Sequence, residues 1–308
     1  MYNIHEVTTG AAATTEPLGT KYKFWYHDPN FGLSLFKEGR PNTGENWAEK
    51  IACELAKAIG LPNARYELAT YEGRNGVLSP TMVERGARIV HGNELLAHGS
   101  TNYIPVGGQR VYGNPNHTLR RVLAYLRAST DFLGAPYNAS RCDETSTALD
   151  FFVGYLMFDA WIANQDRHDE NWGVLRTNDG NLFLAPTYDH GSSMARNLSD
   201  DDRLMRLNTK DMPRHITSFI QQARSGLYPV HSASKPKPLY TLEAFEHAAM
   251  HSPRAAAYWK LRLQHVTCEM VKDIVAKIPG HWMSEPARLF TIELLRLNKL
   301  RILSLPAR

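Results

Sequence analysis

The chain contains few cysteines: only Cys53, Cys142 and Cys268 occur among its 308 residues. Three scattered thiols are too few, and odd in number, for a disulfide framework or a zinc site, and they fit a reducing compartment. Long apolar runs are also missing, because the most apolar stretch, 151–163, is short and is broken by Asp159. We therefore expect no membrane span. Because the N-terminus lacks the basic-then-apolar layout of a signal peptide, we expect a cytoplasmic protein.

An excess of charge of one sign is absent as well. The 35 Lys and Arg residues nearly balance the 31 Asp and Glu residues, so the formal net charge is only +4. No run of basic residues stands out, and we expect no direct binding of nucleic acid. A hydrophobic content of 43% with 21% charged residues is typical of a globular protein. The length allows one large domain or two lobes with a substantial core.

The first part of the chain is rich in strand patterns. Residues 1–20 are polar and are expected to form a loose segment. Alternating or aromatic patterns, separated by turn-forming residues such as 28–30, predict four strands, at 21–26, 33–37, 66–70 and 76–82. Between the second and third strands, an apolar residue every fourth position predicts a helix over 45–59. Residues 41–44 would supply its N-cap, and Gly60 would end it.

The remainder is mainly helical after a candidate hinge at Glu84-Arg85-Gly86. Helical patterns occur at 116–128, 145–163, 241–250, 254–276 and 285–303. The second of these is apolar nearly all round and predicts a buried helix. Strand patterns at 172–176 and 182–185 flank Thr177-Asn178-Asp179-Gly180 and predict a β-hairpin. Residues 224–240, with their Pro and Gly, predict a surface loop.

These elements predict an α+β, bilobal fold. The small lobe, residues 1–85, would be rich in strands and would carry one helix. The larger lobe, residues 86–308, would be mainly helical, with a cleft between the two.

The densest polar segment is Asn164 to Asn171, directly behind the buried helix. A loop that only connected two elements would not need so many carboxylates, because their mutual repulsion costs stability. We therefore expect a cation to relieve that repulsion, either Arg167 or a metal ion.

Phosphoryl transfer from ATP requires a particular set of side chains, and the chain offers them in the required order. Asp166 and Asn171 have the Asp-x-x-x-x-Asn spacing of a kinase catalytic loop. Asp189 follows after one β-hairpin, in the place of a second metal ligand. Lys37 ends a strand, and Glu49 lies on the next helix, as in the lysine–glutamate pair that steadies phosphates. Glu45, one turn earlier, is the alternative partner for the lysine.

The same residues resemble a known family, the HipA-like serine/threonine kinases, which are the toxin kinases of bacterial toxin–antitoxin systems. The resemblance lies in Asn164-x-Asp166-Arg167-His168-x-x-Asn171, Tyr188-Asp189-His190-Gly191-Ser192-Ser193, Gly19-Thr20-Lys21-Tyr22-Lys23-Phe24, Leu35-Phe36-Lys37 and residues 55–61. It covers residues 19–195. Because the chain begins almost at the phosphate-side loop, it resembles a short form of the family, such as HipT, without the additional N-terminal subdomain.

The resemblance implies a protein-kinase-like fold, with ATP and Mg²⁺ as cofactors. It makes Asp166 the catalytic base, Asn171 and Asp189 the Mg²⁺ ligands, and Lys37 the ATP lysine paired with Glu49. On the nucleotide side it adds the phosphate loop, the adenine strand and a loop histidine, namely Gly19, Thr20, Lys21, Met82, Val83, Glu84 and His168. For His168 a role in bracing the loop is favoured over metal binding.

The resemblance also implies partners. They are a protein substrate, such as an aminoacyl-tRNA synthetase or another translation factor, an antitoxin, and a separate protein that supplies the N-terminal subdomain. One departure concerns the metal site, because His190 stands where the family commonly has Asn after the Asp.

Three alternatives remain open at this stage. The first is a lipid or small-molecule kinase of the same fold, since the residues on the ATP side are common to both. The second is a pseudokinase that only docks a partner. The third is a metal-dependent phosphoesterase that uses Asp166, His168, Asp189 and His190 and does not bind ATP.

Overall fold

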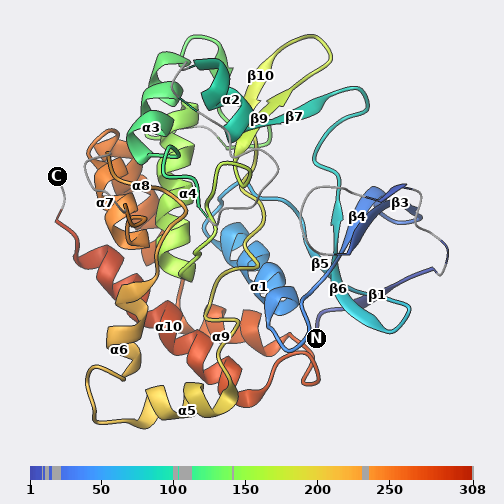
Figure 1. The fold of residues 1–308 in the computed structure, drawn as a ribbon, viewed down its shortest axis with the longest axis vertical. Coiled ribbons are helices and arrows are strands. Elements are labelled where there is room, and N and C mark those ends of the chain that lie inside the picture. Colours follow the sequence, from blue (N-terminus) through green and yellow to red (C-terminus); the bar gives the residue numbers. More distant parts are fainter. Residues whose placement is uncertain are drawn as a thin grey trace.

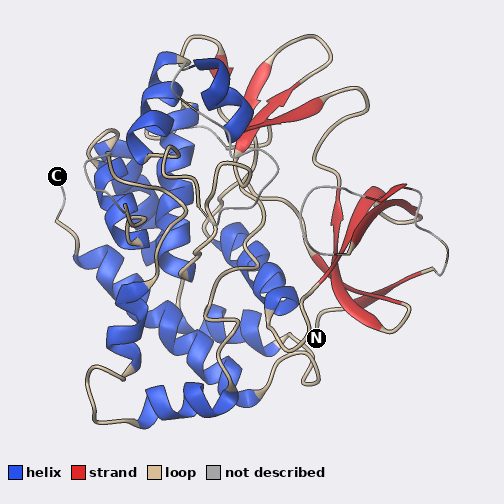
Figure 2. Ribbon diagram, viewed as in Figure 1, coloured by secondary structure: helices blue, strands red, loops and turns tan. Residues whose placement is uncertain are grey.

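The computed structural model describes residues 1–8, 10, 14–15, 22–99, 103, 113–140, 142–230 and 236–306. Strands gather on one side of the molecule and helices fill the other side, as Figure 1 shows by element and Figure 2 by type. The α+β class expected from the sequence is thereby confirmed. None of the helices in these ranges is long and apolar enough to cross a membrane.

A six-stranded sheet forms the strand-rich side. Its strands are β1 (Ile4–Val7), β2 (Thr14–Thr15), β3 (Lys23–Asp28), β4 (Gly32–Glu38), β5 (Glu67–Tyr71) and β6 (Arg74–Pro80). They follow the order β1-β5-β6-β4-β3-β2, and only the β1–β5 pair is parallel. The four predicted strands are all present. The expectation of a loose segment over 1–20 is wrong for residues 4–7, which pair with β5, and for residues 14–15, which pair with β3.

The helix α1 (Glu45–Ala58) begins and ends close to where the sequence predicts. Gly44 is its N-cap, although the cap makes no side-chain hydrogen bond. At the other end Gly60 adopts a left-handed φ of 71°, which lets the chain turn away at little steric cost.

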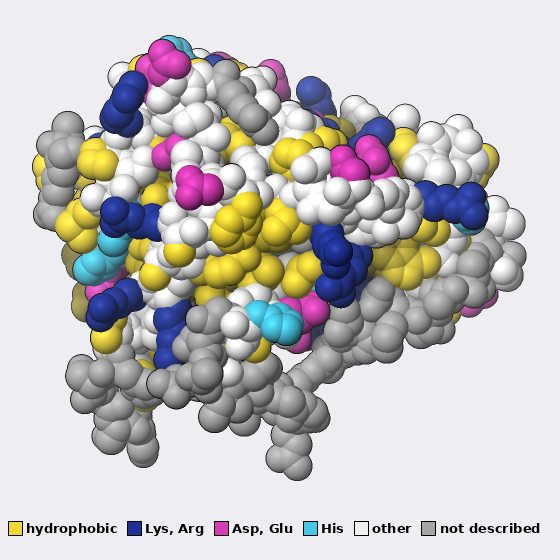
Figure 3. Space-filling model, turned by 90° about the horizontal axis from the view of Figure 1, so that it is seen from above, with side chains coloured by type: hydrophobic (Ala, Val, Ile, Leu, Met, Phe, Trp, Pro, Cys, Tyr) yellow, Lys and Arg dark blue, Asp and Glu magenta, His cyan; other side chains and the backbone are white. Residues whose placement is uncertain are grey.

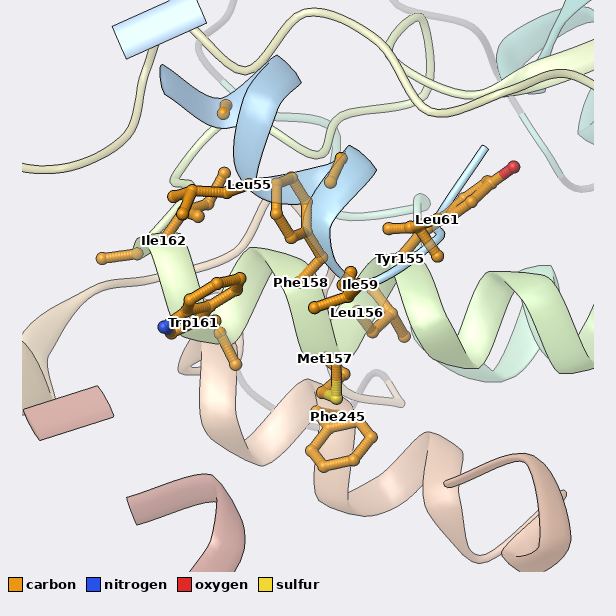
Figure 4. Close-up of a cluster of buried hydrophobic side chains, with 14 of the residues drawn as sticks. Leu55, Ile59, Leu61, Tyr155, Leu156, Met157, Phe158, Trp161, Ile162 and Phe245 are labelled. Atoms are coloured by element: carbon orange, nitrogen blue, oxygen red, sulfur yellow. The ribbon is translucent and has the colours of Figure 1, made fainter. Parts of the chain in front are cut away.

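The core of the helical side is built around α4 (Ala148–Ile162), which is buried on every face. Its start is fixed by a capping box between Thr147 and Asp150. Figure 4 shows α4 between α1 on one side and α7 (Thr241–Ala249) on the other, with Leu55 and Phe245 packed from these two helices. Apolar burial on all sides is the physical reason for the uniformly apolar sequence of α4. The predicted buried helix is confirmed.

A second sheet has four strands in the order β7-β9-β10-β8. They are β7 (Arg88–His91), β8 (Leu133–Gly134), β9 (Gly173–Arg176) and β10 (Leu182–Leu184). The predicted hairpin joins β9 to β10, with Gly180 at a left-handed φ of 87°. The short strands β7 and β8 were not predicted. The chain passes from the first sheet to the second between Pro80 and Arg88, and the predicted lobe boundary at residue 85 falls in this connection.

The remaining helices surround α4. They are α2 (Gly92–Gly99), α3 (Leu119–Ala128), α5 (Asp200–Asn208), α6 (Ile216–Phe219) with the 3-10 turn Ile220–Gln222, α8 (Pro253–Gln264), α9 (Cys268–Ala276) and α10 (Glu285–Ser304). The single helix predicted over 254–276 is wrong. Two helices lie there, because the Thr267 hydroxyl accepts a hydrogen bond from the Met270 amide and starts a new helix. The sequence analysis also missed α2, α5 and α6.

The surface loop predicted over 224–240 is wrong for residues 225–228 and Leu239, whereas Pro229, Val230, Lys237 and Tyr240 are exposed; residues 231–235 lie outside the described residues. Ser225, Leu227 and Leu239 are buried, and the segment forms β-bridges to Thr118 and within itself. Gly226 lies directly against the backbone of residues 167–168. The part of the segment around Gly226 therefore supports the polar loop from behind.

Candidate active site

A cleft of about 1150 Å³ lies between the two sheets. Its walls come from β3 and β4, from the connection 81–87, from β7 and from the segment around residues 168–171 and 188–189. Apolar residues such as Trp25, Leu35 and Ile89 line the cleft together with charged ones, and the face seen from above in Figure 3 also has hydrophobic side chains gathered across its middle. Such a mixture of apolar walls with a few polar groups is typical of a small-molecule site.

Three charged side chains from distant parts of the chain converge in the cleft. The Lys37 ammonium lies 2.5 Å from Asp189 Oδ1 and 3.1 Å from Glu49 Oε1. Lys37 comes from β4 and Glu49 from α1, whereas Asp189 follows the β9–β10 hairpin. The lysine therefore pairs with Glu49, and the alternative partner Glu45 contacts Arg40 and Arg196 instead.

The alternation of β4 explains where Lys37 points. Phe36 is fully buried in the aromatic cluster of the six-stranded sheet, so its neighbours Leu35 and Lys37 face the cleft. Glu49 is only 2% exposed, and its second oxygen accepts a hydrogen bond of 2.8 Å from the His190 amide. The helix therefore turns the Glu49 side chain away from solvent and toward Lys37.

Burial by itself would lower the pKa of Lys37, but the carboxylates of Asp189 and Glu49 raise it well above its ordinary value. The lysine is therefore cationic at neutral pH. Because the folded pKa is raised, the stability that this ion pair contributes is present at neutral pH and is lost only as the pH rises past about 10.4. A fixed positive charge at the back of an apolar-walled cleft attracts an anion such as a phosphate.

Asp189 adopts a left-handed backbone conformation with a φ of 57°. Its amide donates a hydrogen bond of 3.1 Å to the Tyr66 hydroxyl, which lies in the same cleft. Non-glycine residues in this conformation cost about 1–3 kcal/mol and occur often at functional sites. Lys37 and Tyr66 together hold Asp189 there, with about a third of its side chain exposed to the cleft.

The polar loop behind α4 is anchored by a buried ion pair. Arg167 donates to both carboxylate oxygens of Asp159 on α4, at 2.8 Å each, and both residues are fully buried. Arg167 also donates to the Asn171 carbonyl oxygen and to the Thr187 hydroxyl. The predicted cation for the loop is therefore Arg167, although its carboxylate partner lies on the helix. The pKa of Arg167, which burial alone would lower, is raised by Asp159.

Asp166 and Asn171 are held by the backbone of their own loop. Asp166 N–H donates to Asn164 Oδ1, and Asn171 Nδ2 donates to the Asp166 carbonyl at 2.6 Å. Because Nδ2 of Asn171 donates to the Asp166 carbonyl oxygen, Oδ1 of Asn171 points away from that carbonyl. Asn171 lines the cleft beside Asp189, and about a third of the Asp166 side chain is exposed.

The two histidines of the site differ in environment. His168 lines the cleft, and its Nδ1 accepts a hydrogen bond from the Glu170 amide, which braces the loop. His190 is buried, and its Nε2 lies 2.8 Å from the Thr187 hydroxyl and 3.3 Å from Arg167. Burial and the charge of Arg167 lower the pKa of His190 well below its usual value.

These contacts argue against the phosphoesterase alternative. His190 Nε2 already accepts hydrogen bonds, so it does not face the cleft as a metal ligand. Within the ranges that the structure describes, no three His, Cys, Asp or Glu side chains have the geometry of a metal cluster. Asn171 and Asp189 both line the cleft, and their hard oxygen atoms are of the kind that could hold Mg²⁺ together with a substrate phosphate.

The connection between the sheets carries the predicted adenine residues. Met82, Val83 and Glu84 all line the cleft. The Val83 amide donates to the Thr81 hydroxyl, whereas the Met82 carbonyl and the Glu84 amide have no hydrogen-bond partner in the described parts of the chain. Gly19, Thr20 and Lys21 of the predicted phosphate loop lie outside the described residues.

Several residues of the site were missed from the sequence. Tyr66 holds the Asp189 amide, and Ser192 donates a hydrogen bond of 3.3 Å to Asp166 Oδ2. Arg196 in turn donates to the Ser192 hydroxyl. Ser192 was quoted only as part of a motif, and no sequence pattern indicated Tyr66 or Arg196, because their contacts are made across the fold.

The comparison with family models gives a match to the HipA-like C-terminal domain over residues 17–282. The chain belongs to this family. The match spans most of the chain and includes each predicted site residue from Gly19 to Asp189, so the resemblance seen in the motifs is confirmed. The comparison with curated proteins returned no match.

The fold of this HipA-like chain is also similar to those of solved structures. A crystal structure of the proinflammatory kinase CtkA from Helicobacter pylori is similar with a TM-score of 0.72 and 20% identity, over 98% of this chain and 96% of that chain. HipA from Shewanella oneidensis MR-1, in its toxin–antitoxin complex with HipB and operator DNA, is similar with a TM-score of 0.54 and 13% identity. That match covers 96% of this chain and 67% of HipA. The predicted kinase-like α+β fold is confirmed.

Proposed function

We propose that this HipA-like chain is an ATP- and Mg²⁺-dependent serine/threonine-protein kinase. The observation that carries the proposal is the convergence of Lys37, Glu49 and Asp189 in a cleft that Asn171 also lines. A scaffold that only docks a partner has no need of a buried lysine between two carboxylates, since such a cluster must be desolvated and held. A nucleotide site does need it.

In the proposed complex, each residue of the chain has a distinct task. Lys37 binds the α- and β-phosphates, and Glu49 holds the lysine in place. The Met82 carbonyl and the Glu84 amide would hydrogen-bond the adenine edge, which presents a donor and an acceptor. Asn171 and Asp189 would hold Mg²⁺, which neutralises phosphate charge during transfer.

Asp166 is the proposed base. Its carboxylate takes the proton of the acceptor hydroxyl as the hydroxyl oxygen forms a bond to the γ-phosphorus and the bond from that phosphorus to ADP breaks. Arg167 and Asp159 contribute by keeping the loop backbone fixed, and this matters because a misplacement of 1 Å can lower a rate about 100-fold.

For the acceptor we propose a serine or threonine on a protein of translation, such as an aminoacyl-tRNA synthetase, because the family resemblance implies a toxin kinase. The same reasoning suggests a cytoplasmic location and an antitoxin partner. The structure of the Shewanella HipA, a complex with HipB, supports the idea of an antitoxin partner.

Labelling of a cell lysate with thiophosphate-ATP, read by mass spectrometry, tests this proposal. We expect labelled serine or threonine with the wild-type protein and none with Asp166→Ala. Asp201→Ala, at an exposed aspartate on α5, is the matched control and should label as the wild type does. If only lipids or small molecules were labelled, the chain would be a lipid or small-molecule kinase and not a protein kinase. If Mg·ATP gave neither label nor protection against thermal unfolding, the proposal would be overturned.

A further inference from the structure

A second ion pair connects α1 with the segment after Asp189. Glu45, in the first turn of α1, lies 2.5 Å from Arg196, and both residues are buried. The same segment is joined to α1 through the backbone, because the Gly44 amide donates to the Arg196 carbonyl at 3.0 Å. Arg196 is therefore attached to the start of α1 by both its side chain and its main chain.

The other branch of Arg196 leads to the proposed base. Arg196 Nη2 donates a hydrogen bond of 3.0 Å to the Ser192 hydroxyl, and Ser192 donates one of 3.3 Å to Asp166 Oδ2. Arginine can only donate, so the serine oxygen must accept, and its single proton is left for Asp166. The direction of both hydrogen bonds is thereby fixed by chemistry, and one oxygen of Asp166 is occupied by a donor from within the chain.

The backbone between Ser192 and Arg196 is bent so that both side chains reach the same place. Met194 and Ala195 both adopt left-handed conformations, with φ values of 50° and 52°. The Gln165 amide donates to the Ser192 carbonyl, and the Met194 amide donates to the Ile162 carbonyl at the end of α4. Two adjacent non-glycine residues in this conformation are costly, and the surrounding hydrogen bonds must hold them there.

We infer that Ser192 and Arg196 are positioning residues that orient Asp166 and make its orientation depend on the seating of α1. The inference rests on the proposed kinase function. With Oδ2 of Asp166 held by Ser192, Oδ1, which lies 3.8 Å from His168 Nε2, is left to take the proton of the acceptor hydroxyl. The helix α1 carries Glu49 for the nucleotide side and Glu45 for the acceptor side, one turn apart. A single helix thus aligns both halves of the reaction.

The test compares steady-state phosphoryl transfer by Ser192→Ala, Ser192→Thr and Arg196→Lys with the wild type. We expect Ser192→Ala and Arg196→Lys to lower kcat about tenfold or more, because the base is no longer held. The KM for Mg·ATP should stay within about twofold, since Lys37, Glu49 and Asp189 are untouched. Ser192→Thr retains the hydroxyl and should recover most of kcat.

Two matched controls lie far from the site on α10. Thr291 is fully buried, and its hydroxyl has no partner within the described residues, so Thr291→Val removes an unused hydroxyl. Arg288 donates to the carbonyls of Val275 and Ile278, so Arg288→Lys removes a structural guanidinium of similar burial. Neither should change kcat.

A double-mutant cycle tests the dependence on α1. If Glu45, Arg196 and Ser192 act as one chain of contacts, their effects on kcat should not be independent. The fold-decrease in kcat of the double variant Glu45→Gln/Ser192→Ala should then be clearly smaller than the product of the fold-decreases of the two single variants. Thermal unfolding of each variant separates a loss of fold from a loss of alignment.

The outcomes separate the two proposals. Wild-type transfer together with an unchanged kcat in Ser192→Ala would overturn the positioning role alone. A lower kcat with an equally raised KM for Mg·ATP would also overturn it, because the defect would then lie on the nucleotide side. A wild-type protein that neither binds Mg·ATP nor transfers phosphate would overturn the proposed function, and the positioning role with it.

Discussion

The Lys37 ammonium and the Asp189 carboxylate lie 2.5 Å apart, although 152 positions separate them in the chain. Lys37 lies on β4, inside the six-stranded sheet, and Asp189 lies in the segment that follows the β9–β10 hairpin. Their contact therefore joins the two sides of the cleft. Glu49 completes the contact from α1, which is itself packed against α4 (Figure 4). The residues that the sequence analysis connected only by their order are connected in space by the fold.

Replacing Lys37 by Met should abolish most phosphoryl transfer. The change removes the only cation seen between Glu49 and Asp189 in the described structure, and loss of one such electrostatic group costs about 100- to 1000-fold in kcat. Because Glu49 stays buried, the free energy of unfolding should also fall, by about 1–3 kcal/mol. Transfer assays and urea unfolding measure the two effects. Lys272→Met, at an exposed lysine of α9, should leave both unchanged; equal transfer by Lys37→Met would contradict the assignment.

Replacing Arg167 by Met should destabilise the protein more than any surface change. It would leave the Asp159 carboxylate buried without its guanidinium, and breaking such a pair costs about 3–5 kcal/mol. Arg167→Lys should lose less stability than Arg167→Met but should stay below the wild type, because an ammonium cannot donate to both carboxylate oxygens as the planar guanidinium does. The free energy of unfolding in urea is the measurement. Arg176→Met, at an exposed position of β9, serves as the control. A loss below about 1 kcal/mol in Arg167→Met would speak against a structural anchor.

Replacing Gly226 by Ala should disturb the polar loop from behind. A Cβ at this position would lie 2.5 Å from both the carbonyl carbon of Arg167 and the amide nitrogen of His168, and these backbone atoms cannot move without shifting Asp166. We expect a loss of about 1–3 kcal/mol in stability together with a lower kcat. Gly280→Ala is the matched control, since a Cβ there has nothing within 4 Å. Wild-type kcat in Gly226→Ala would show that the loop does not depend on this support.

Stability should fall below about pH 6.5 because of His117. Burial lowers the pKa of this histidine to about 4, and its Nε2 accepts a hydrogen bond from Trp172 while Nδ1 faces the Gly226 carbonyl. The folded state thus keeps His117 neutral while the unfolded chain binds a proton. The stability that the neutral, buried His117 contributes is fully present above about pH 6.5. As the pH falls toward 4, the free energy of unfolding should decrease by roughly 3 kcal/mol.

Urea unfolding at several pH values checks this prediction. His117→Gln should be less stable at pH 7 but should lose less stability on acidification. His251→Gln, at an exposed histidine, should follow the wild type. An unchanged slope between pH 6.5 and 4 in His117→Gln would contradict the assignment.

The local parts of the fold were predictable because their signals are local. The repeat of Trp47, Ile51 and Leu55 marks one face of α1, and the apolar run of α4 marks burial on all sides. By contrast, β1 is four residues long and is stabilised by β5, more than sixty positions away. A strand whose identity comes from its partner leaves little trace in its own sequence.

The candidate site shows the same division. The spacing of Asp166 and Asn171 is local, and the structure places both in one loop. We expected Arg167 to pair with a carboxylate of its own loop, but its partner is Asp159 in the last turn of α4. The break between α8 and α9 could have been found, because Thr267 is a good N-cap residue. The contacts of Tyr66 and Arg196 depend on tertiary structure and could not.

The central claim is that the Asp189 carboxylate works with Lys37 on a Mg²⁺-bound nucleotide. The most direct measurement is the rate of phosphate transfer from γ-labelled ATP as a function of Mg²⁺ concentration, for the wild type and for Asp189→Asn, with thermal unfolding to verify the fold. We predict Mg²⁺-dependent transfer by the wild type and none above background by Asp189→Asn. Full transfer by folded Asp189→Asn would contradict the account.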